Sequence, residues 1–381
     1  MDNNRFDFII IGNGLAGFQL ALAMAQDAYF DNYSIALIDP SSKDKNDKTW
    51  CFWEKDKGKW DDIIHKKWHK TIFSTKEKLH YIQLVPYCYK MLRSIDFYQL
   101  VKATLLKKSN FEFILEKVTT VDGEQITTTN NHNYSANKHI FDSRLPKEYF
   151  EFQQNYNHIH QHFKGWFIET NDDYFDTDCF TTMDYTIKHQ DDTTFTYVLP
   201  ITKRKALIEF TFFTPYLTDL DIYDQYLKKY INDILKIDNY KIVEVEQGNI
   251  PMTDFPFTKY NSTRLTKIGT GGGWVKASTG YSFKHTEKKV AIIVSNLKRG
   301  LLPSKGLIKK KFTFYDRIFL NVLKEENDKG EWIFKQFYTR NNTRTMFKFL
   351  DEESSIAQDL RIMGSLFSTS FIKAFLRQLI K

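Results

Sequence analysis

The chain has 381 residues, of which 42% are hydrophobic and 27% are charged. These proportions exclude an intrinsically disordered chain and are typical of a globular protein with two or three substructures. The formal net charge is +7, but no nucleic-acid-binding motif accompanies it, so we expect no nucleic-acid partner. Three scattered cysteines exclude a disulfide framework and indicate a reducing cytoplasm. No apolar stretch has the length of a membrane span, so we expect none.

The first forty residues predict a dinucleotide-binding βαβ unit. We expect a buried strand over 6–11, an apolar helix over 18–25 and a second strand over 34–38. Between the first strand and the helix stands a GxGxxG turn, whose residues nearest a ligand are Gly12, Gly14, Leu15, Ala16 and Gly17. Such glycines permit a tight turn, a close approach to a pyrophosphate and close packing of the helix on the sheet. Asp39, which ends the second strand, is expected to accept a hydrogen bond from a ribose 2′-OH.

The elements that follow alternate between helices and short β-type runs. They are a helix over 97–107, strands over 111–115 and 134–140, an antiparallel sheet between 164 and 214 with strands over 195–199 and 206–213, and a helix over 223–235. From residue 312 to the C-terminus the pattern is mostly helical.

A second glycine-rich segment, 269–273, follows a strand expected over 265–269 and precedes a helix expected over 286–298. A return to the first sheet with a second such turn is what a flavin requires, because backbone N–H groups there bind the pyrimidine edge of the ring. Thr270, Thr279 and Gly280 are the candidate contacts. The alternative is a connection of small residues between two domains.

The expected fold class is α/β, with a discontinuous Rossmann-like FAD-binding domain, an inserted substrate domain built on an antiparallel sheet, and a helical C-terminal region. The expected boundaries are 1–60, 85–145 and 262–300 for the FAD-binding domain, 61–84 and 146–261 for the substrate domain, and 301–381 for the helical region.

Glu209 is a single carboxylate within the apolar, β-favouring run 207–213. Its side chain faces either solvent, from an alternating strand, or an apolar site. In the second case desolvation raises the pKa of the carboxyl, which then holds a proton at neutral pH. The pattern leaves both possibilities open.

Two groups of histidines have spacings that metal sites also use. They are His158, His160 and His162 on one face of a strand, and His65 and His69 at helical i, i+4 spacing. Neither group has an accompanying set of acidic ligands, so we predict no metal site.

Several short motifs, taken in order, resemble the bacterial lycopene β-cyclases over nearly the whole chain. Besides the GxGxxG turn they are Thr49–Trp53, Phe141–Arg144, Tyr197–Pro200, Leu207–Glu209, Ala277–Ser282, Phe314–Leu320 and Phe349–Asp351. The resemblance implies a flavoprotein fold similar to the glutathione-reductase and hydroxybenzoate-hydroxylase group.

The resemblance also implies the activity: a non-redox cyclisation that converts the ψ-ends of lycopene to β-rings, giving γ- and β-carotene. Reduced FAD is the implied cofactor and NAD(P)H its electron donor. The implied partners are lycopene, related acyclic carotenoids and a membrane surface. The implied location is the cytoplasm, with peripheral binding to the inner face of the membrane, for which we expect the basic region 298–311 to be used. The oligomeric state stays open.

By the same resemblance Glu209 is the acid. Many relatives have a second acidic residue at the next position, where this chain has Phe210, so the base is left open: Glu209 itself, a water or Asp184. Arg93 and Arg144 are candidate partners of the diphosphate, and the alternative is that both form surface salt bridges. Thr270 stands where the wider group often has an aspartate.

The alternative function on the same fold is an FAD-dependent monooxygenase or a prenyl reductase that consumes NAD(P)H stoichiometrically.

Overall fold

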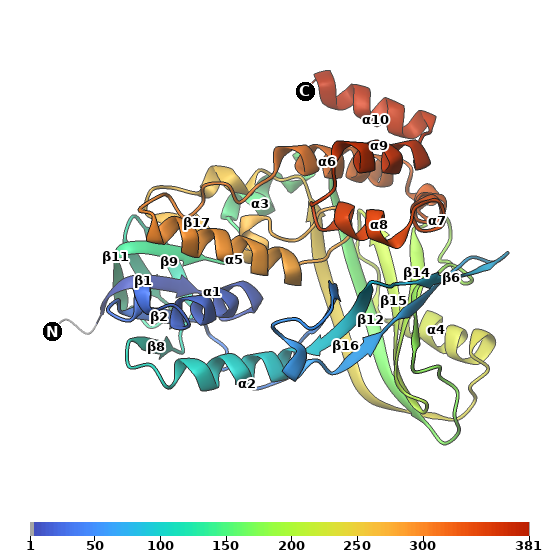
Figure 1. Cartoon of the computed structure of the whole chain (residues 1–381), viewed down its shortest axis with the longest axis horizontal. Helices are drawn as coiled ribbons and strands as arrows, with labels where there is room; N and C mark the ends of the chain where they lie inside the picture. The colour runs from blue at the N-terminus through green and yellow to red at the C-terminus, as the bar shows by residue number, and fades with distance from the viewer. Residues whose placement is uncertain (1–3, 381) are drawn as a thin grey trace.

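The computed structural model describes residues 4–380. Within these residues two large sheets stand beside each other, and the C-terminal helices lie across the top of the second sheet (Figure 1). No helix in this part of the chain is both long and apolar enough to cross a membrane.

The first sheet has a parallel core with an antiparallel extension, in the order β8-β2-β1-β11-β10-β9, with β17 pairing with β11. Its parallel strands are β1 (Arg5–Ile11), β2 (Ile35–Ile38), β8 (Phe111–Ile114), β11 (Asn133–Asp142) and β17 (Leu265–Lys267), and its antiparallel ones are β9 (Val118–Asp122) and β10 (Gln125–Thr128). The helices that pack with it are α1 (Leu15–Ala25), α2 (Ser94–Leu105) and α5 (Phe283–Lys298). Because both faces of the parallel core are covered, residues 8–11 of β1 are all apolar and buried and do not alternate.

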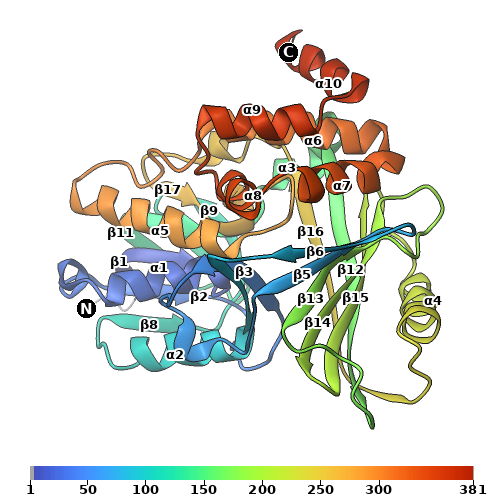
Figure 2. The same cartoon turned by 45° about the vertical axis from the view of Figure 1, so that its right-hand side comes forward.

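A small sheet, β3-β7-β4, lies between the two large ones (Figure 2). It consists of β3 (Thr49–Lys55), β4 (Lys66–Trp68) and β7 (Tyr87–Arg93). The sequence patterns did not predict this sheet.

The second large sheet has the order β16-β12-β15-β14-β13-β5-β6. Its strands are β16 (Tyr240–Thr253), β12 (His158–Thr170), β15 (Lys205–Thr214), β14 (Thr194–Thr202), β13 (Cys179–Asp184), β5 (Lys70–Ser74) and β6 (Leu79–Gln83). All neighbours pair antiparallel except β13 and β5, which are parallel.

Helices cover both faces of this sheet. The helix α4 (Leu220–Lys229) packs against Ile208, Phe210 and Phe212 of β15, whereas Leu207 and Phe213 point to the opposite face. The helices on that opposite side are α6 (Lys310–Glu325), α7 (Gly330–Arg340), α8 (Thr343–Leu350), α9 (Ile356–Ser365) and α10 (Thr369–Ile380), and a short α3 (Lys147–Phe152) precedes β12. A strand buried on both faces explains why residues 207–213 are almost uniformly apolar.

The strands and helices expected at both glycine-rich turns are present, as are the predicted strands β14 and β15. His65 and His69 do not share a helix: His65 precedes β4 and His69 separates β4 from β5, so the helical spacing was misleading. No three metal-ligating side chains converge within residues 4–380. The domain boundaries stay a prediction.

Candidate active site

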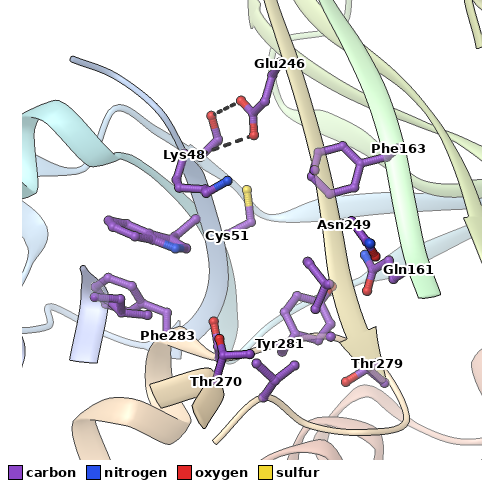
Figure 3. A pocket seen from close by; sticks show the side chains of 18 of the residues that line it. Lys48, Cys51, Gln161, Phe163, Glu246, Asn249, Thr270, Thr279, Tyr281 and Phe283 are labelled. Carbon is purple, nitrogen blue, oxygen red and sulfur yellow. Dashed lines mark hydrogen bonds between the residues drawn. The ribbon is translucent and has the colours of Figure 1, made fainter. Parts of the chain in front are cut away.

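A cavity of about 570 Å³ extends from the first glycine-rich turn to the second large sheet. One side is formed by the GxGxxG turn, the start of β3, the second glycine-rich turn and the start of α5. The opposite side is formed by residues of β12, β15, β14 and β16, and by Phe334 and Tyr338 of α7. Figure 3 shows side chains from both sides converging on this space. The cavity therefore joins a dinucleotide-type turn to the interior of the other sheet.

The GxGxxG turn has the geometry that its glycines predict. Gly12 has φ +97°, and a Cβ at Gly17 would stand 2.0 Å from the carbonyl oxygen of Gly12, so neither position has room for a side chain. Gly14 lines the cavity, and a Cβ built there would have no heavy atom within 4 Å. No side chain caps the N-terminus of α1. Free N–H groups beside open space are suited to a phosphate.

Asp39 lies at the end of β2, as predicted, but it is not among the cavity-lining residues. Its carboxylate accepts hydrogen bonds from the backbone N–H groups of Asn13 and Ser41, both at 2.7 Å. Asp39 therefore holds the turn in place, and its contact with a ribose stays a prediction.

The second glycine-rich segment is a 3₁₀ turn, Gly269–Gly272, that packs against the end of β11. A Cβ at Gly271 would lie 2.3 Å from the carbonyl oxygen of Arg144, which explains the glycine there. Thr270 and Thr279 line the cavity beside this turn (Figure 3). Gly280, just before α5, also lines it.

Two buried polar atoms in this part of the cavity have no hydrogen-bond partner: the hydroxyl oxygen of Thr279 and Oε1 of Gln161. Buried polar atoms are rarely left unpaired, so unpaired ones that line a cavity indicate a polar ligand. Together with the open space at Gly14, these atoms fit a flavin dinucleotide laid from the first turn to the second.

The two arginines proposed for the diphosphate are engaged elsewhere. Nη2 of Arg93 donates to both carboxylate oxygens of Glu244, at 2.6 and 2.5 Å, and its guanidinium lies over the ring of Phe167. Arg144 donates to both oxygens of Asp142 at 2.9 Å. Neither lines the cavity, so the diphosphate contact expected for Arg93 does not fit this geometry.

Glu209 lines the cavity and is 9% exposed. Because both faces of β15 are covered, the alternative of a solvent-facing side chain does not hold. The hydroxyl of Thr211 donates to its Oε1 at 2.8 Å. Burial, with a smaller contribution from the nearby Glu246, raises the pKa of the Glu209 carboxyl to about 8. This carboxyl is therefore protonated at neutral pH and has a proton to donate into the cavity.

Glu246, on β16, is a second cavity-lining carboxylate that the sequence analysis missed. Thr49 binds it through its hydroxyl, at 2.5 Å, and its backbone N–H, at 3.2 Å (Figure 3). Residues 242–246, Ile-Val-Glu-Val-Glu, mix β-branched and charged residues, a pattern typical of an edge strand with few buried residues. This pattern could have predicted β16.

Asp184, proposed as one possible base, lies outside the cavity. Its carboxylate accepts hydrogen bonds from the hydroxyl of Tyr230 and the backbone N–H of Thr186, both at 2.8 Å. Since Tyr230 belongs to the core on the α4 side of the sheet, Asp184 faces away from Glu209 and is not a candidate base.

Aromatic side chains form much of the remaining wall. The hydroxyl of Tyr197 donates to that of Tyr89 at 2.8 Å, and the hydroxyls of Tyr89 and Tyr281 are 3.1 Å apart. Burial raises the pKa of all three phenols, which are therefore neutral. Other rings of the cavity wall include those of Phe195, Phe213, Phe334 and Tyr338. A protonated carboxyl in such surroundings can donate its proton to an apolar molecule, and aromatic faces attract a cation.

Solved structures with the same fold include a geranylgeranyl bacteriochlorophyll reductase-like protein from Thermoplasma acidophilum, with a TM-score of 0.61 and 12% identity over 99% of each chain. The flavin-dependent brominase Bmp2 has a TM-score of 0.56 and 13% identity, covering 99% of this chain and 98% of that one. The flavin-dependent monooxygenase PieE, solved with FAD and substrate, has a TM-score of 0.59 and 12% identity, covering 98% of this chain and 72% of that one. At these identities the similarity shows the fold alone.

Comparison with curated proteins gives no match. The family model described as "Lycopene cyclase protein", in contrast, matches residues 7–376, which is nearly the whole chain. The protein belongs to the lycopene cyclase family.

Proposed function

We propose that this protein is a lycopene β-cyclase that closes the ψ-ends of lycopene into β-rings by acid–base catalysis with reduced FAD. The observation that carries the proposal is the position of Glu209, a protonated carboxyl at the inner part of an aromatic cavity that begins at a dinucleotide turn. Family membership supports the substrate class.

The FAD would be held by the two glycine-rich turns. Gly12, Gly14, Leu15, Ala16 and Gly17 would hold the diphosphate at the N-terminus of α1, and Thr270, Thr279 and Gly280 would contact the ring system and its side chain. When bound in reduced form, with NAD(P)H as the proposed electron donor, the flavin supplies negative charge that stabilises a nearby cation.

In the proposed reaction Glu209 protonates C2 of the terminal isopropylidene group, which leaves a cation at C1. The C5=C6 double bond then attacks C1, the charge moves to C5, and loss of the C6 proton completes the β-ring. The buried wall excludes water, which would otherwise quench the cation. Aromatic rings of the cavity wall that face the cation would each stabilise it by about 0.5–2 kcal/mol.

Expression of the chain in a lycopene-accumulating bacterium tests this proposal. We expect γ- or β-carotene of the same molecular mass as lycopene. The rival function, a monooxygenase or reductase, changes the mass of the product and consumes one nicotinamide per product. Unchanged lycopene, or stoichiometric consumption of NAD(P)H by the purified enzyme, would contradict the cyclase.

Because lycopene dissolves in membranes, we further propose that the enzyme binds peripherally to an anionic bilayer. The surface we propose is the lipid-facing patch, defined as Ile356, Leu360, Met363, Phe367, Ile372, Phe375 and Leu376 on and between α9 and α10. These side chains are 37–74% exposed, and Arg361, Lys373 and Arg377 lie among them. Apolar residues beside cations are the combination that binds anionic lipid surfaces.

The basic region expected for this role, 298–311, stays a second candidate surface, although three of its lysines also make contacts within the fold. Lys298 pairs with Asp27 at 2.7 Å, and Lys311 pairs with Asp359 at the same distance. Lys309 donates to the carbonyl oxygen of Glu352 at 2.7 Å. These cations already have partners within the fold.

A further inference from the structure

We propose that Glu246 is the base that removes the C6 proton, so that the site uses two carboxyls from different strands. This inference rests on the proposed cyclase function and goes beyond it, because it assigns the residue that completes the reaction.

The register of the second sheet places the two carboxyls opposite each other. Gly165 of β12 pairs with Glu209 on β15 and, on its other side, with Glu246 on β16. Residues paired across one position point to the same face of a sheet, and Glu209 and Glu246 both line the cavity. With neighbouring strands about 4.8 Å apart, their Cα atoms are separated by about 10 Å.

Gly165, on the strand between these two glutamates, has no room for a side chain of its own. A Cβ there would stand 2.8 Å from Cδ1 of Leu207 and 3.4 Å from the Cβ of Glu209. A larger residue at position 165 would collide with Leu207 and press on Glu209, so the glycine lets both of these cavity-lining side chains keep their positions.

The two carboxyls differ in their hydrogen-bond donors. Glu246 accepts two hydrogen bonds from Thr49, and donors directed at a carboxylate favour its ionised form, whereas Glu209 accepts one, from Thr211. Burial raises the pKa of both groups, and their like charges oppose joint ionisation. We therefore assign the proton to Glu209 and the negative charge to Glu246, which has the larger number of donors.

The other groups facing Glu246 are few. Lys48, beside Thr49, lowers the pKa of the Glu246 carboxyl and Glu244, on the same strand, raises it. The thiol of Cys51, on β3, lies near both Glu246 and Glu209, and its own pKa is raised by burial, so it is neutral. Asp47, the remaining carboxylate of the cavity wall, accepts hydrogen bonds from Tyr98 and Ser94 at the dinucleotide end.

The proton balance of the step is complete. The O–H bond of Glu209 breaks as the C2–H bond forms, and the C1–C6 bond forms from the electrons of the C5=C6 bond. The C6–H bond then breaks, its electron pair becomes the new C5=C6 bond, and the proton passes to the carboxylate of Glu246. Before the next closure the proton returns to Glu209 by exchange with water, so substrate and product are isomers.

The test measures kcat, FAD content and the pH profile of purified full-length enzyme with reduced FAD and lycopene in liposomes. For Glu246→Gln we expect at least a tenfold lower kcat at unchanged FAD content. The ascending limb of the profile, which reports ionisation of the base, should disappear, and the descending limb should move to lower pH because Glu209 loses a neighbouring negative charge. Glu246→Asp should keep the ascending limb.

Thr49→Val provides a second variant of nearly unchanged shape. It removes one donor to Glu246, which raises the pKa of that carboxyl, so the ascending limb should move to higher pH. Glu169→Gln is the matched control, because this exposed glutamate on β12 pairs only with Lys205 and should leave kcat and both limbs unchanged.

A Glu246→Gln enzyme with wild-type kcat overturns the inference. So does a reduced kcat with the ascending limb in its wild-type position, since that result indicates a structural role for the bond to Thr49. If the wild-type enzyme itself closes no ring, the proposed function fails, and this outcome is distinguished from the other two by the wild-type measurement alone.

Discussion

Glu209 combines three properties that an acid for an apolar substrate requires. It is buried, it is held in one orientation by Thr211, and it faces a cavity whose other walls are largely aromatic. The physical cause of its protonation is desolvation, because a carboxylate loses its hydration on transfer to such a site. The neighbouring Glu246 adds to the effect through like-charge repulsion.

This raised pKa has a consequence for stability. In the unfolded chain the Glu209 carboxyl ionises near pH 4.5, whereas in the folded protein it keeps its proton to about pH 8. Folding therefore becomes less favourable as the pH rises from about 4.5 to 8, and is affected little by this group below or above that window.

We predict that Glu209→Gln stabilises the protein relative to wild type at pH 9 but not at pH 5, by an amount on the order of a few kcal/mol. Thermal unfolding of both proteins at the two pH values, at matched FAD content, measures this difference. An equal difference in Tm at pH 5 and pH 9 would show that Glu209 is ionised in the folded state.

The pattern of residues 207–213 indicated an acid in an apolar strand, but not which face it occupied. The face occupied by Glu209 could be decided only by knowing that a helix covers the other face of β15. That helix is α4, which is formed by residues 220–229, outside the strand. Glu246 was missed for a related reason: most of β16 is exposed or half-buried, so its residues lack the apolar run by which the other strands were predicted.

At the scale of elements, the first βαβ unit was the most predictable part of the chain. Its glycine requirements are local, since the Cβ of residue 17 would meet the carbonyl of residue 12 only 2.0 Å away. The small β3-β7-β4 sheet was not predicted. Residues of β3 pair with residues of β7 that lie 32–44 positions later in the chain, and a local pattern does not reveal such a long-range contact.

We predict that Gly17→Ala lowers the free energy of unfolding by about 1–3 kcal/mol, because the added methyl forces α1 away from the turn. FAD content should fall with it. Gly364→Ala is the control. This glycine lies in α9, and a Cβ built there would have no heavy atom within 4 Å, so the change should leave the free energy of unfolding unchanged or raise it by up to about 1 kcal/mol.

Denaturant unfolding and the flavin absorbance of the purified proteins check both variants. Equal stability and equal FAD content in Gly17→Ala and wild type would contradict the close packing of α1 against the turn.

At the scale of the whole molecule, the chain brings a dinucleotide turn and a buried acid together across two sheets. Residues of the cavity come from positions 14 to 338, so no local stretch of sequence contains the site. The C-terminal helices lie over the second sheet (Figures 1 and 2), and α9 and α10 carry the exposed apolar side chains of the proposed lipid-facing patch.

We predict that the protein floats with vesicles containing anionic lipid and that the double variant Leu360→Ser, Phe367→Ser floats much less. Both residues are more than 60% exposed, so folding should be unaffected. Leu106→Ser is a matched control, since Leu106 is 74% exposed at the end of α2, on the opposite side of the molecule in Figure 1. Equal flotation of wild type and the double variant would contradict this surface.

The most direct test of the central claim compares ring closure by the wild-type enzyme and Glu209→Gln, both purified, matched in FAD content and supplied with lycopene and a reductant. General acid catalysis contributes about 10²–10⁴-fold, so we predict that the variant forms cyclic carotene at 1% of the wild-type rate or less while it still binds FAD. A variant that closes rings at a rate near that of wild type would show that Glu209 is not the acid.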